Sequence, residues 1–392
     1  MRVMSSADAL RTAATQNVPA VVLESAGAED TPGLERLHVD RIDVAAPQAG
    51  EVLVDVAACG VCHTDLHVIK DEVAFPKPAV LGHEVSGIVA AVGEGVTHVS
   101  LGDRVACSFI MPCGTCRHCE KGLEDLCETF FQQNRLAGHL YDGTTRYTRG
   151  GEDVAMYSMG GHARSCVVPA RAVFPLPDSV PLHEAAILGC SLFTAHGAVR
   201  TVADVQPGET VAVVATGGIG LSIIHLARAA GAERVIAVDI DDAKLALAAE
   251  LGATDVINSL TQDPADEVRR LLGHGVDVAF EALGSVRTVQ QTVDLLDDGG
   301  RAVLAGIAPA GQTFDVDIAK VVRRKLRILG TFGAPASTTM PDVIRLAADG
   351  EIDLDRLITH SFAFEEIPEA YRMLNDREIR GRGLVVIRPE LR

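Results

Sequence analysis

The stretch Val211–Asp239, VAVVATGGIGLSIIHLARAAGAERVIAVD, decides the fold expected for this chain. It opens on a short run rich in valine, turns through several glycines and continues into an amphipathic helix. The helix ends at Gly231, and a second apolar run, Arg234–Asp239, follows it. Two such runs joined by a helix indicate neighbouring parallel strands in a sheet that is covered on both faces.

The same alternation continues to Leu326–Thr331, the sixth apolar run. Six strands with helical crossovers predict a doubly wound, dinucleotide-binding α/β domain. The chain before Gly208 has short strands separated by turns, such as Val18–Leu23 and Glu51–Ala58, and this predicts an irregular β-rich domain. The expected parts are an N-terminal extension at 1–17, a catalytic domain at 18–192 with a cysteine lobe at 112–128, a nucleotide-binding domain at 193–333 and a return to the first domain at 334–392.

The glycine-rich turn reads Ala215-x-Gly217-Gly218-x-Gly220 and departs from G-x-G-x-x-G at its first position. It is weak evidence alone, but here it follows a strand and opens a helix whose unpaired N–H groups can hold a pyrophosphate. Asp239 ends the next strand, where a carboxylate would accept hydrogen bonds from an adenosine ribose and repel a 2′-phosphate. The pattern favours NAD over NADP, although Asp239 could instead be the N-cap of the following helix.

The composition limits the partners. The 392 residues carry 53 acidic and 35 basic side chains, a formal net charge of −18, so a nucleic acid or an anionic membrane would be repelled. No apolar run is long enough to span a membrane, and the first 17 residues lack the apolar centre of a signal peptide. Nine cysteines without an export signal indicate a reducing compartment, and we expect a cytoplasmic protein.

Two short motifs bring metal-binding side chains together. Gly60–His67 reads GVCHTDLH and Gly82–Glu84 reads GHE. Cys62 and His83 offer a thiolate and an imidazole, which suit zinc. A catalytic zinc needs three protein ligands, and Cys190, in an apolar segment, is our candidate for the third. Each of the three alone could also be an ordinary buried core residue.

Cysteine spacing indicates a second cluster. The spacing is C-x2-C-x2-C-x7-C in a lobe with almost no apolar content, so burial cannot hold the lobe together. Four thiolates around one zinc would contribute roughly 10 kcal/mol or more, as in model peptides, and would leave no open position. An iron–sulfur cluster is the competitor, but the fourth cysteine follows after seven residues rather than three. The four are Cys113, Cys116, Cys119 and Cys127.

The other polar segments receive simpler predictions. Residues 128–162 are predicted to form a long polar loop over a cleft or a contact between subunits. Three histidines of polar loops are predicted to be solvated: His118, His139 and His162. Three further thiols lie beside apolar strand residues and are predicted to serve packing: Cys59, Cys107 and Cys166.

Together these motifs resemble the zinc-dependent medium-chain alcohol dehydrogenases. The resemblance extends from about Val18 to Ile387 and is carried by GVCHTDLH, by GHE followed by Gly87, by the four-cysteine lobe, by LGC before Thr194, and by the glycine turn with Asp239. It implies a GroES-like catalytic domain and a Rossmann domain. It also implies NAD, two zinc ions per chain (one catalytic, one structural), a small alcohol or aldehyde as substrate, and a homodimer or homotetramer.

The resemblance also implies roles for single residues. Glu84 would approach the metal during ligand exchange, and Asp65 would accept the other N–H of the zinc-bound imidazole. Thr64 and His67 match a proton relay that passes through the cofactor ribose. The expected cofactor contacts are His63, where relatives often carry an arginine, together with Thr194, Lys244 and Arg382. The expected apolar walls of a substrate cleft between the domains are Phe109 and Ile307.

The leading hypothesis is reversible hydride transfer between NAD and a primary or secondary alcohol. Zinc lowers the pKa of a bound water towards roughly 7, and the same Lewis acidity would act on an alcohol. Alternatives are a thiol-dependent formaldehyde dehydrogenase, a nicotinoprotein and, in a different class, a non-catalytic nucleotide-binding redox sensor. Glutathione-dependent relatives place an arginine shortly after the last lobe cysteine. Here Phe130 and Phe131 stand there, which argues against glutathione.

Overall fold

The structure, a computed structural model, describes residues 15–25 and 33–391. The chain forms two compact units. Unit 1 comprises residues 1–190, 335–348 and 358–392, and unit 2 comprises residues 191–334 and 349–357. The return predicted for 334–392 is therefore interrupted by Asp349–Leu357. The expected extension at 1–17 lies almost wholly outside the described residues, and the first strand begins at Thr15.

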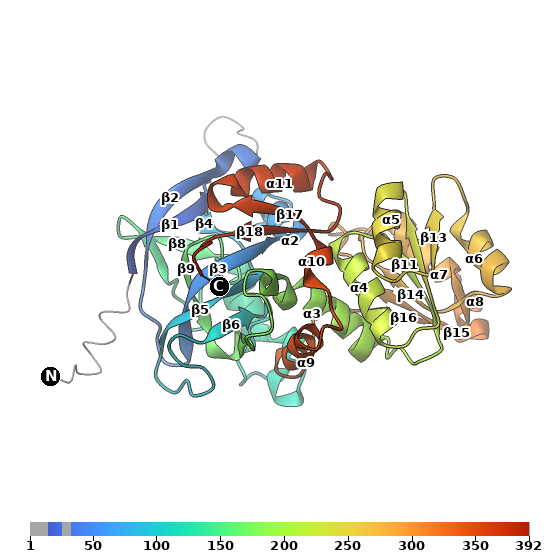
Figure 1. The fold of residues 1–392 in the computed structure, drawn as a ribbon, viewed down its shortest axis with the longest axis horizontal. Coiled ribbons are helices and arrows are strands. Elements are labelled where there is room, and N and C mark those ends of the chain that lie inside the picture. Colours follow the sequence, from blue (N-terminus) through green and yellow to red (C-terminus); the bar gives the residue numbers. More distant parts are fainter. Residues whose placement is uncertain (1–14, 26–32, 392) are drawn as a thin grey trace. The chain divides into compact units, whose positions relative to one another are not determined.

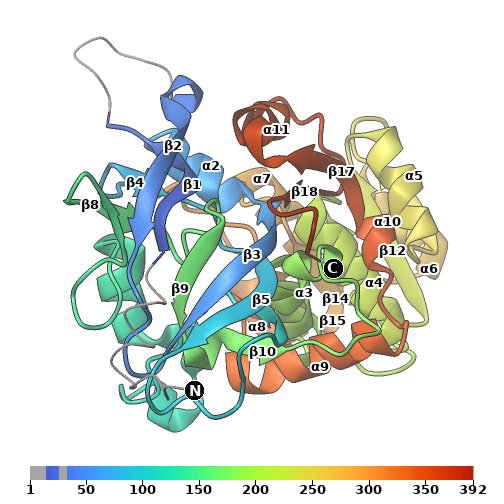
Figure 2. The same cartoon turned by 60° about the vertical axis from the view of Figure 1, so that its left-hand side comes forward.

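Unit 1 is built from two sheets. A closed barrel joins β1, β2, β7, β8 and β4, and a seven-stranded sheet runs β10-β6-β5-β3-β18-β17 with β9 paired to β3. Figure 2 shows β9, β3 and β5 side by side. The barrel strands are β1 (Thr15–Leu23), β2 (Leu37–Val44), β4 (Ala79–Val80), β7 (Tyr147–Arg149) and β8 (Glu152–Met156). The others are β3 (Glu51–Val61), β5 (Val85–Val92), β6 (Arg104–Cys107), β9 (Ser165–Pro169), β10 (Val173–Pro175), β17 (Ile358–Ala363) and β18 (Arg382–Val386).

The C-terminal strand β18 completes the sheet that carries the first metal motif. It pairs antiparallel with β3, and Gly383 lies opposite Val61. This pairing brings Arg382, the residue before Gly383, close to the GVCHTDLH motif. The helices of unit 1 are α2 (His63–Ile69), α9 (Ala336–Ala348) and α11 (Ile367–Asn375). Within the described residues, no helix has the length and apolar character needed to cross a bilayer.

Residues 128–162 are not the long polar loop that we predicted. They contain a π-helix at Phe130–Leu136 and the antiparallel hairpin β7–β8, which completes the barrel. Tyr147, Val154 and Met156 of this hairpin are fully buried. The strands are only three and five residues long, so they are too short for a periodic pattern to stand out.

Unit 2 is the predicted doubly wound sheet. Its six parallel strands run β13-β12-β11-β14-β15-β16, the order of dinucleotide-binding folds, with the reversal between β11 and β14. Figure 1 shows these strands with helices along them. The strands are β11 (Thr210–Val214), β12 (Arg234–Asp239), β13 (Asp255–Asn258), β14 (Val276–Glu281), β15 (Leu296–Leu304) and β16 (Arg327–Gly330). The helices are α3 (Ser191–His196), α4 (Gly218–Ala229), α5 (Asp242–Glu250), α6 (Pro264–Leu272), α7 (Val286–Asp294), α8 (Ile318–Arg324) and α10 (Leu354–Leu357).

Local sequence explains these elements. β-Branched side chains such as Val214, Ile236 and Val238 are buried in the core of the sheet, as expected for strands covered on both faces. Polar residues at the helix starts accept hydrogen bonds from the first free N–H groups. The helix-capping residues of this kind are Asp241, Asp263, Ser285 and Asp317.

Candidate functional site

The first metal-binding cluster begins where β3 passes into α2. Cys62 is the N-cap of α2, with extended backbone (φ −127°, ψ 145°), and its thiol makes no capping hydrogen bond. The Cys62 thiol donates to the Thr64 hydroxyl oxygen over 3.6 Å. The sulfur does not cap the helix, so it can serve as a metal ligand in its thiolate form.

His83 lies in the loop between β4 and β5, with Asp65 buried behind it. His83 Nδ1 lies 3.0 Å from Asp65 Oδ2. The Gly82 N–H donates to Asp65 Oδ1 over 3.1 Å. Gly82 has φ +95°, a conformation that favours glycine and that turns His83 inward. Asp65 thus occupies the place behind the imidazole that the resemblance implied, and the other ring nitrogen, Nε2, faces the cluster.

Cys190 supplies the second sulfur. It follows the buried 3₁₀ helix Glu184–Gly189, and its Sγ lies 3.5 Å from His83 Nε2. Ligand atoms of Cys62, His83, Glu84 and Cys190 all lie within 4.8 Å of one another, and no residue of the four is more than 9% exposed. Three distant segments of the chain, each predicted to carry a zinc ligand, therefore meet at one point. Two sulfurs and an imidazole are a donor set that fits zinc and leaves a position open.

The electrostatics of this cluster also suit a cation. A hydrogen bond from Cys190 and the nearby His83 ring hold the pKa of the Cys62 thiol well below its usual value, against the opposing effect of burial. Burial raises the pKa of Glu84, and the charge of Arg382 opposes that rise. Arg382 Nη2 pairs with Glu84 Oε1, whereas Glu84 Oε2 is buried and has no hydrogen-bond partner among the described residues. A buried carboxylate oxygen without a donor beside two sulfurs is consistent with a metal site.

The second cluster is the four-cysteine lobe, and its ligand atoms also lie within 4.8 Å of one another. Backbone N–H groups point at its sulfurs: Cys116 N donates to Cys113 Sγ over 3.3 Å and Phe130 N to Cys127 Sγ over 3.4 Å. Hydrogen bonds of this kind stabilise thiolates. Glu124 ties the lobe to the start of α9 by accepting from Ser337 N over 2.8 Å. Four sulfurs fit a closed, structural zinc site.

In unit 2, the glycine turn has the geometry of a phosphate-binding loop. Gly217 is the N-cap of α4, and a Cβ at Gly217 would meet no atom within 4 Å, so a ligand could approach the backbone there. A Cβ at Gly220 would lie 2.0 Å from Ala215 O, so the close packing of helix on strand requires glycine. Ala215, where the pattern departs from glycine, takes φ +74°, a left-handed conformation that costs a non-glycine residue about 1 kcal/mol.

Asp239 is fixed at the end of β12 by four hydrogen bonds. Its Oδ2 accepts from Thr216 N and Oγ1, and its Oδ1 accepts from the N–H groups of Ile240 and Asp241. The carboxylate therefore joins the two loops that follow β11 and β12. It is not the N-cap of α5; Asp241 takes that role and accepts from Ala243 N and Lys244 N.

Comparison with known protein families agrees with both units. Residues 48–178 match the alcohol dehydrogenase GroES-like domain, and residues 218–349 match the zinc-binding dehydrogenase domain. The chain belongs to the zinc-dependent medium-chain dehydrogenases. It is therefore an oxidoreductase of that family, and the two cysteine clusters have donor sets that fit a catalytic and a structural zinc.

Three relatives of this dehydrogenase illustrate the range of the family. An S-(hydroxymethyl)glutathione dehydrogenase from Synechocystis sp. is 37% identical over 347 residues, 87% of this chain and 94% of that protein. The crystal structure of benzyl alcohol dehydrogenase from Acinetobacter calcoaceticus is 31% identical, covers 95% of this chain and 100% of its own, and has a TM-score of 0.88. A zinc-binding dehydrogenase structure from Sinorhizobium meliloti 1021 with bound NADP is 28% identical, covers 95% and 100%, and has a TM-score of 0.77.

Around the buried zinc site of the dehydrogenase lies an aromatic wall that includes one residue the sequence analysis missed. The rings of Phe109, which we predicted, and Tyr157, which we did not, lie 6.0 and 6.5 Å from the His83 ring. Phe75 packs edge-on against Tyr157 at 4.8 Å, and Arg135 lies over the Tyr157 ring at 4.2 Å. Tyr157 stands in a stretch without a motif, so no local signal could have identified it.

The predicted relay residues of the dehydrogenase lie on α2. Thr64 contacts Cys62, and His67 Nδ1 pairs with Glu72 Oε2. Lys70 Nζ lies 3.0 Å from the other oxygen of Glu72. His67 is part-exposed, so the imidazole is accessible to solvent at this end of the helix.

The remaining predicted contacts are distributed over both units of the dehydrogenase. His63 is exposed at the start of α2, and Arg382 is committed to Glu84. In unit 2, Thr194 is buried in α3, Lys244 is half-buried in α5 and Ile307 is 58% exposed. Their roles towards cofactor and substrate stay predictions. As predicted, three of the leftover thiols are fully buried: Cys59, Cys107 and Cys166.

His162 was predicted to be solvated, and this was wrong. It is 1% exposed, and burial lowers its pKa to about 4. Its Nε2 lies 2.6 Å from the hydroxyl of Tyr371, a residue of α11 that the sequence analysis did not single out. The two residues are 209 positions apart, so the partner of His162 could not be read from its neighbours in the chain. By contrast, His118 and His139 are only partly buried.

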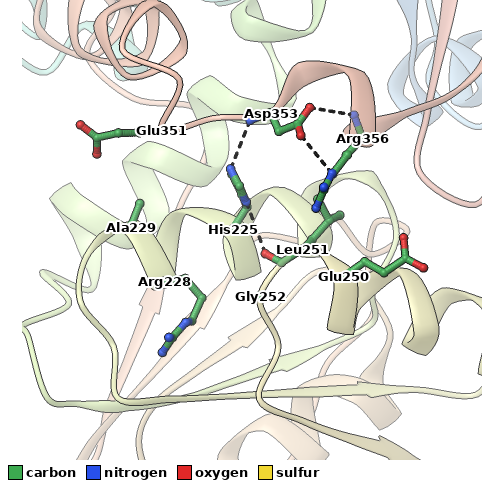
Figure 3. A pocket seen from close by; sticks show the side chains of 9 residues that line it. All are labelled: His225, Arg228, Ala229, Glu250, Leu251, Gly252, Glu351, Asp353 and Arg356. Atoms are coloured by element: carbon green, nitrogen blue, oxygen red, sulfur yellow. Dashed lines mark hydrogen bonds and ion pairs between the residues drawn. The ribbon is translucent and has the colours of Figure 1, made fainter.

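A separate cavity of about 330 Å³ in unit 2 has a structural role (Figure 3). His225 Nδ1 donates to Leu251 O and its Nε2 accepts from Asp353 N, each over 3.3 Å. Arg356 pairs with Asp353 at 3.0 Å. No thiol lines this cavity, and its central histidine ties Asp349–Leu357 to α4.

Proposed function

We propose that this dehydrogenase reversibly transfers a hydride between NAD and a primary or secondary alcohol. The buried cluster of Cys62, His83 and Cys190 carries the proposal, because its donor set leaves a position for a substrate oxygen. The alcohol gives a hydride to NAD⁺ and a proton to the protein, and the product is an aldehyde or ketone. Bound zinc would supply the Lewis acidity that lowers the pKa of the hydroxyl, and NAD would accept the hydride.

Thr64 and His67 are placed to take up the proton. They stand three residues apart on α2 and so share one face of the helix. The Thr64 hydroxyl contacts Cys62 at the cluster, whereas His67 is part-exposed. The proton would pass from the substrate hydroxyl to Thr64, then to His67 and to water. Glu72 would stabilise the protonated imidazole from its Nδ1 side.

For the cofactor, the charge at Asp239 favours NAD. A fixed carboxylate at the end of β12 would repel a 2′-phosphate, and the open space at Gly217 admits the pyrophosphate. The NADP-bound relative makes the comparison of both cofactors necessary. We expect kcat/KM to be at least about tenfold higher with NAD, that is, about 1.4 kcal/mol of discrimination. A preference for NADP would contradict this assignment.

For the substrate, the aromatic wall favours an alcohol with an apolar or aromatic substituent. Phe109 and Tyr157 flank His83, and a benzyl alcohol dehydrogenase is among the relatives. Each methylene accommodated in an apolar pocket contributes about 1–3 kcal/mol, so benzyl alcohol should exceed ethanol in kcat/KM by at least about tenfold. Steady-state rates over a panel of primary and secondary alcohols test this order.

A second candidate function is oxidation of a thiol adduct of formaldehyde. The relative that acts on S-(hydroxymethyl)glutathione points to it, and so does Arg135, whose Nη1 is buried without a hydrogen-bond partner within the described residues. Arg135 lies over Tyr157, beside the cluster, where it could hold a carboxylate of the thiol. Formaldehyde oxidation that requires glutathione, with a KM raised in Arg135→Gln but unchanged for benzyl alcohol, would favour this candidate. Benzyl alcohol oxidation without thiol favours the first.

We also propose a cytoplasmic homodimer. The sequence carries no feature that favours another compartment, and the resemblance implies a dimer with a tetramer as the alternative. Sedimentation velocity of the zinc-loaded protein should give about twice the chain mass of 41.3 kDa. A species of one chain mass would contradict the dimer.

A further inference from the structure

A buried polar pair lies behind the zinc-site histidine and has no role in the function proposed above. Tyr371 and His162 are both almost completely buried, and their side chains make a 2.6 Å hydrogen bond. Their rings meet edge to face at 5.6 Å. Burying a hydroxyl and an imidazole costs free energy unless they are well paired, so this pair needs an explanation.

The backbone links His162 to the segment that carries His83. His162 N donates to Leu81 O, and Gly161 N donates to Gly82 O, each over 2.8 Å. A Cβ at Gly82 would lie 2.9 Å from His162 Cγ, so the imidazole packs directly on the Gly82 backbone. Gly82 in turn donates its N–H to Asp65, the residue behind His83.

These contacts form one continuous path from Tyr371 to the zinc-site histidine. The Tyr371 hydroxyl is hydrogen-bonded to His162 Nε2, and the His162 backbone and ring hold the Leu81–Gly82 segment. Gly82 N donates to Asp65 Oδ1. The path ends at the Asp65 carboxylate, whose Oδ2 lies 3.0 Å from His83 Nδ1.

We propose that Tyr371 and His162 are positioning residues for the catalytic zinc site: they fix Asp65 and the Leu81–His83 segment so that His83 Nε2 is held towards the two sulfurs. The inference rests on the proposed function only in taking this cluster as the catalytic one. Mutation of a residue that orients a metal-binding histidine lowers metal affinity by about 10–100-fold. Tyr371 and His162 contact such residues rather than His83 itself, so we expect the lower end of this range. Removing the Tyr371 hydroxyl should therefore weaken zinc binding at this cluster by about tenfold.

The test is zinc retention in the full-length, zinc-loaded protein against a chromogenic chelator. Tyr371→Phe keeps the ring and removes the hydroxyl. Tyr147→Phe is the matched control, because Tyr147 is also fully buried in unit 1 and its hydroxyl bonds Gly160 O at 2.9 Å and Ser165 O at 3.2 Å. Zinc is expected to leave the two clusters in two kinetic phases. The phase that is missing in Cys62→Ser is assigned to the buried cluster.

Tyr371→Phe should release that zinc about ten times more readily and leave the four-cysteine phase unchanged, whereas Tyr147→Phe should alter neither phase. His162→Gln, whose amide can still hydrogen-bond the Tyr371 hydroxyl, should retain zinc better than His162→Leu. Equal zinc retention in Tyr371→Phe and Tyr147→Phe would overturn the proposal, and so would equal loss from both clusters. Because no substrate is used, the result stands apart from whether the protein oxidises alcohols.

Discussion

The two cysteine clusters of unit 1 both offer thiolates for a metal ion, but they differ in burial and in the types of ligand around the ion. The cluster of Cys62, His83 and Cys190 is buried and combines different ligand types, and a carboxylate oxygen of Glu84 beside it has no donor in the described part of the chain. The lobe cluster lies near the surface, has four like ligands and directs backbone N–H groups at its sulfurs. A catalytic zinc site needs an open coordination position and surrounding residues that orient its ligands. A structural zinc site needs only a complete set of protein ligands.

The largest expected effect comes from Cys62→Ser. Loss of the metal removes several kcal/mol of stabilisation of developing charge, so kcat/KM should fall by about 10³-fold or more. The far-ultraviolet circular dichroism should not change, because the lobe cluster and both cores remain. Steady-state kinetics with benzyl alcohol and NAD measure the loss. Turnover within tenfold of the unaltered protein would show that the buried cluster is not the catalytic one.

Cys116→Ser tests the other side of the comparison. The lobe contributes little apolar burial, so without its metal it should open, and trypsin should cleave after Arg117 or Lys121. Zinc binding to such sites is worth on the order of 10 kcal/mol in peptides, and part of this should appear as a lower midpoint of thermal unfolding. The buried cluster should keep its zinc. A variant as resistant to trypsin as the parent would show that the lobe needs no metal.

The surroundings of the buried cluster predict a pH dependence. His162 has a folded-state pKa of about 4, below the ordinary value of 6.5, because it is buried. As the pH falls, His162 of the unfolded chain therefore binds a proton before His162 of the folded protein does. The stability that neutral His162 contributes is fully present above pH 6.5 and is lost between pH 6.5 and 4. The total is about 3 kcal/mol, with about 2 kcal/mol lost by pH 5. Denaturant unfolding at pH 7.5 and 5 should show a smaller acid loss in His162→Gln; an equal loss would contradict the assignment.

The smallest and sharpest test compares two threonines that make the same contact. Thr64 Oγ1 lies 3.6 Å from Cys62 Sγ, and Thr115 Oγ1 lies 3.7 Å from Cys113 Sγ. Thr64→Ala should lower kcat by about 10²-fold, because it removes a proton-transfer group. Thr115→Ala should leave kcat unchanged and alter stability by less than about 0.5 kcal/mol. Equal effects of the two substitutions on kcat would remove the distinction between the clusters.

The features of the molecule that could be predicted from the sequence are local or periodic. The strand and helix pattern from Val211 onward predicted a six-stranded doubly wound sheet. The structure has such a sheet, with the strand order β13-β12-β11-β14-β15-β16. The spacing of the lobe cysteines is a property of one short segment. Cys190 was harder to predict, because its assignment rested on the apolar segment around it and on the resemblance rather than on a ligand spacing.

The parts that could not be predicted depend on contacts between distant segments. Arg382 and Glu84 are 298 positions apart, and they form an ion pair because β18 pairs with β3. No local pattern in the sequence predicts this pairing. His162 looked like a loop residue because its burial is created by α11. The hairpin β7–β8 is stabilised by closing the barrel rather than by its own sequence. In each case tertiary packing overrides what the local pattern suggests.

The most direct test is an anomalous difference map at the zinc edge from crystals of the zinc-replete protein. Two peaks per chain are predicted: one bonded to Cys62 Sγ, His83 Nε2 and Cys190 Sγ, at about 2.3 Å from sulfur and 2.0–2.1 Å from nitrogen, and one among the four lobe sulfurs. A single peak in the lobe, with the three other side chains free of metal, would contradict the central claim.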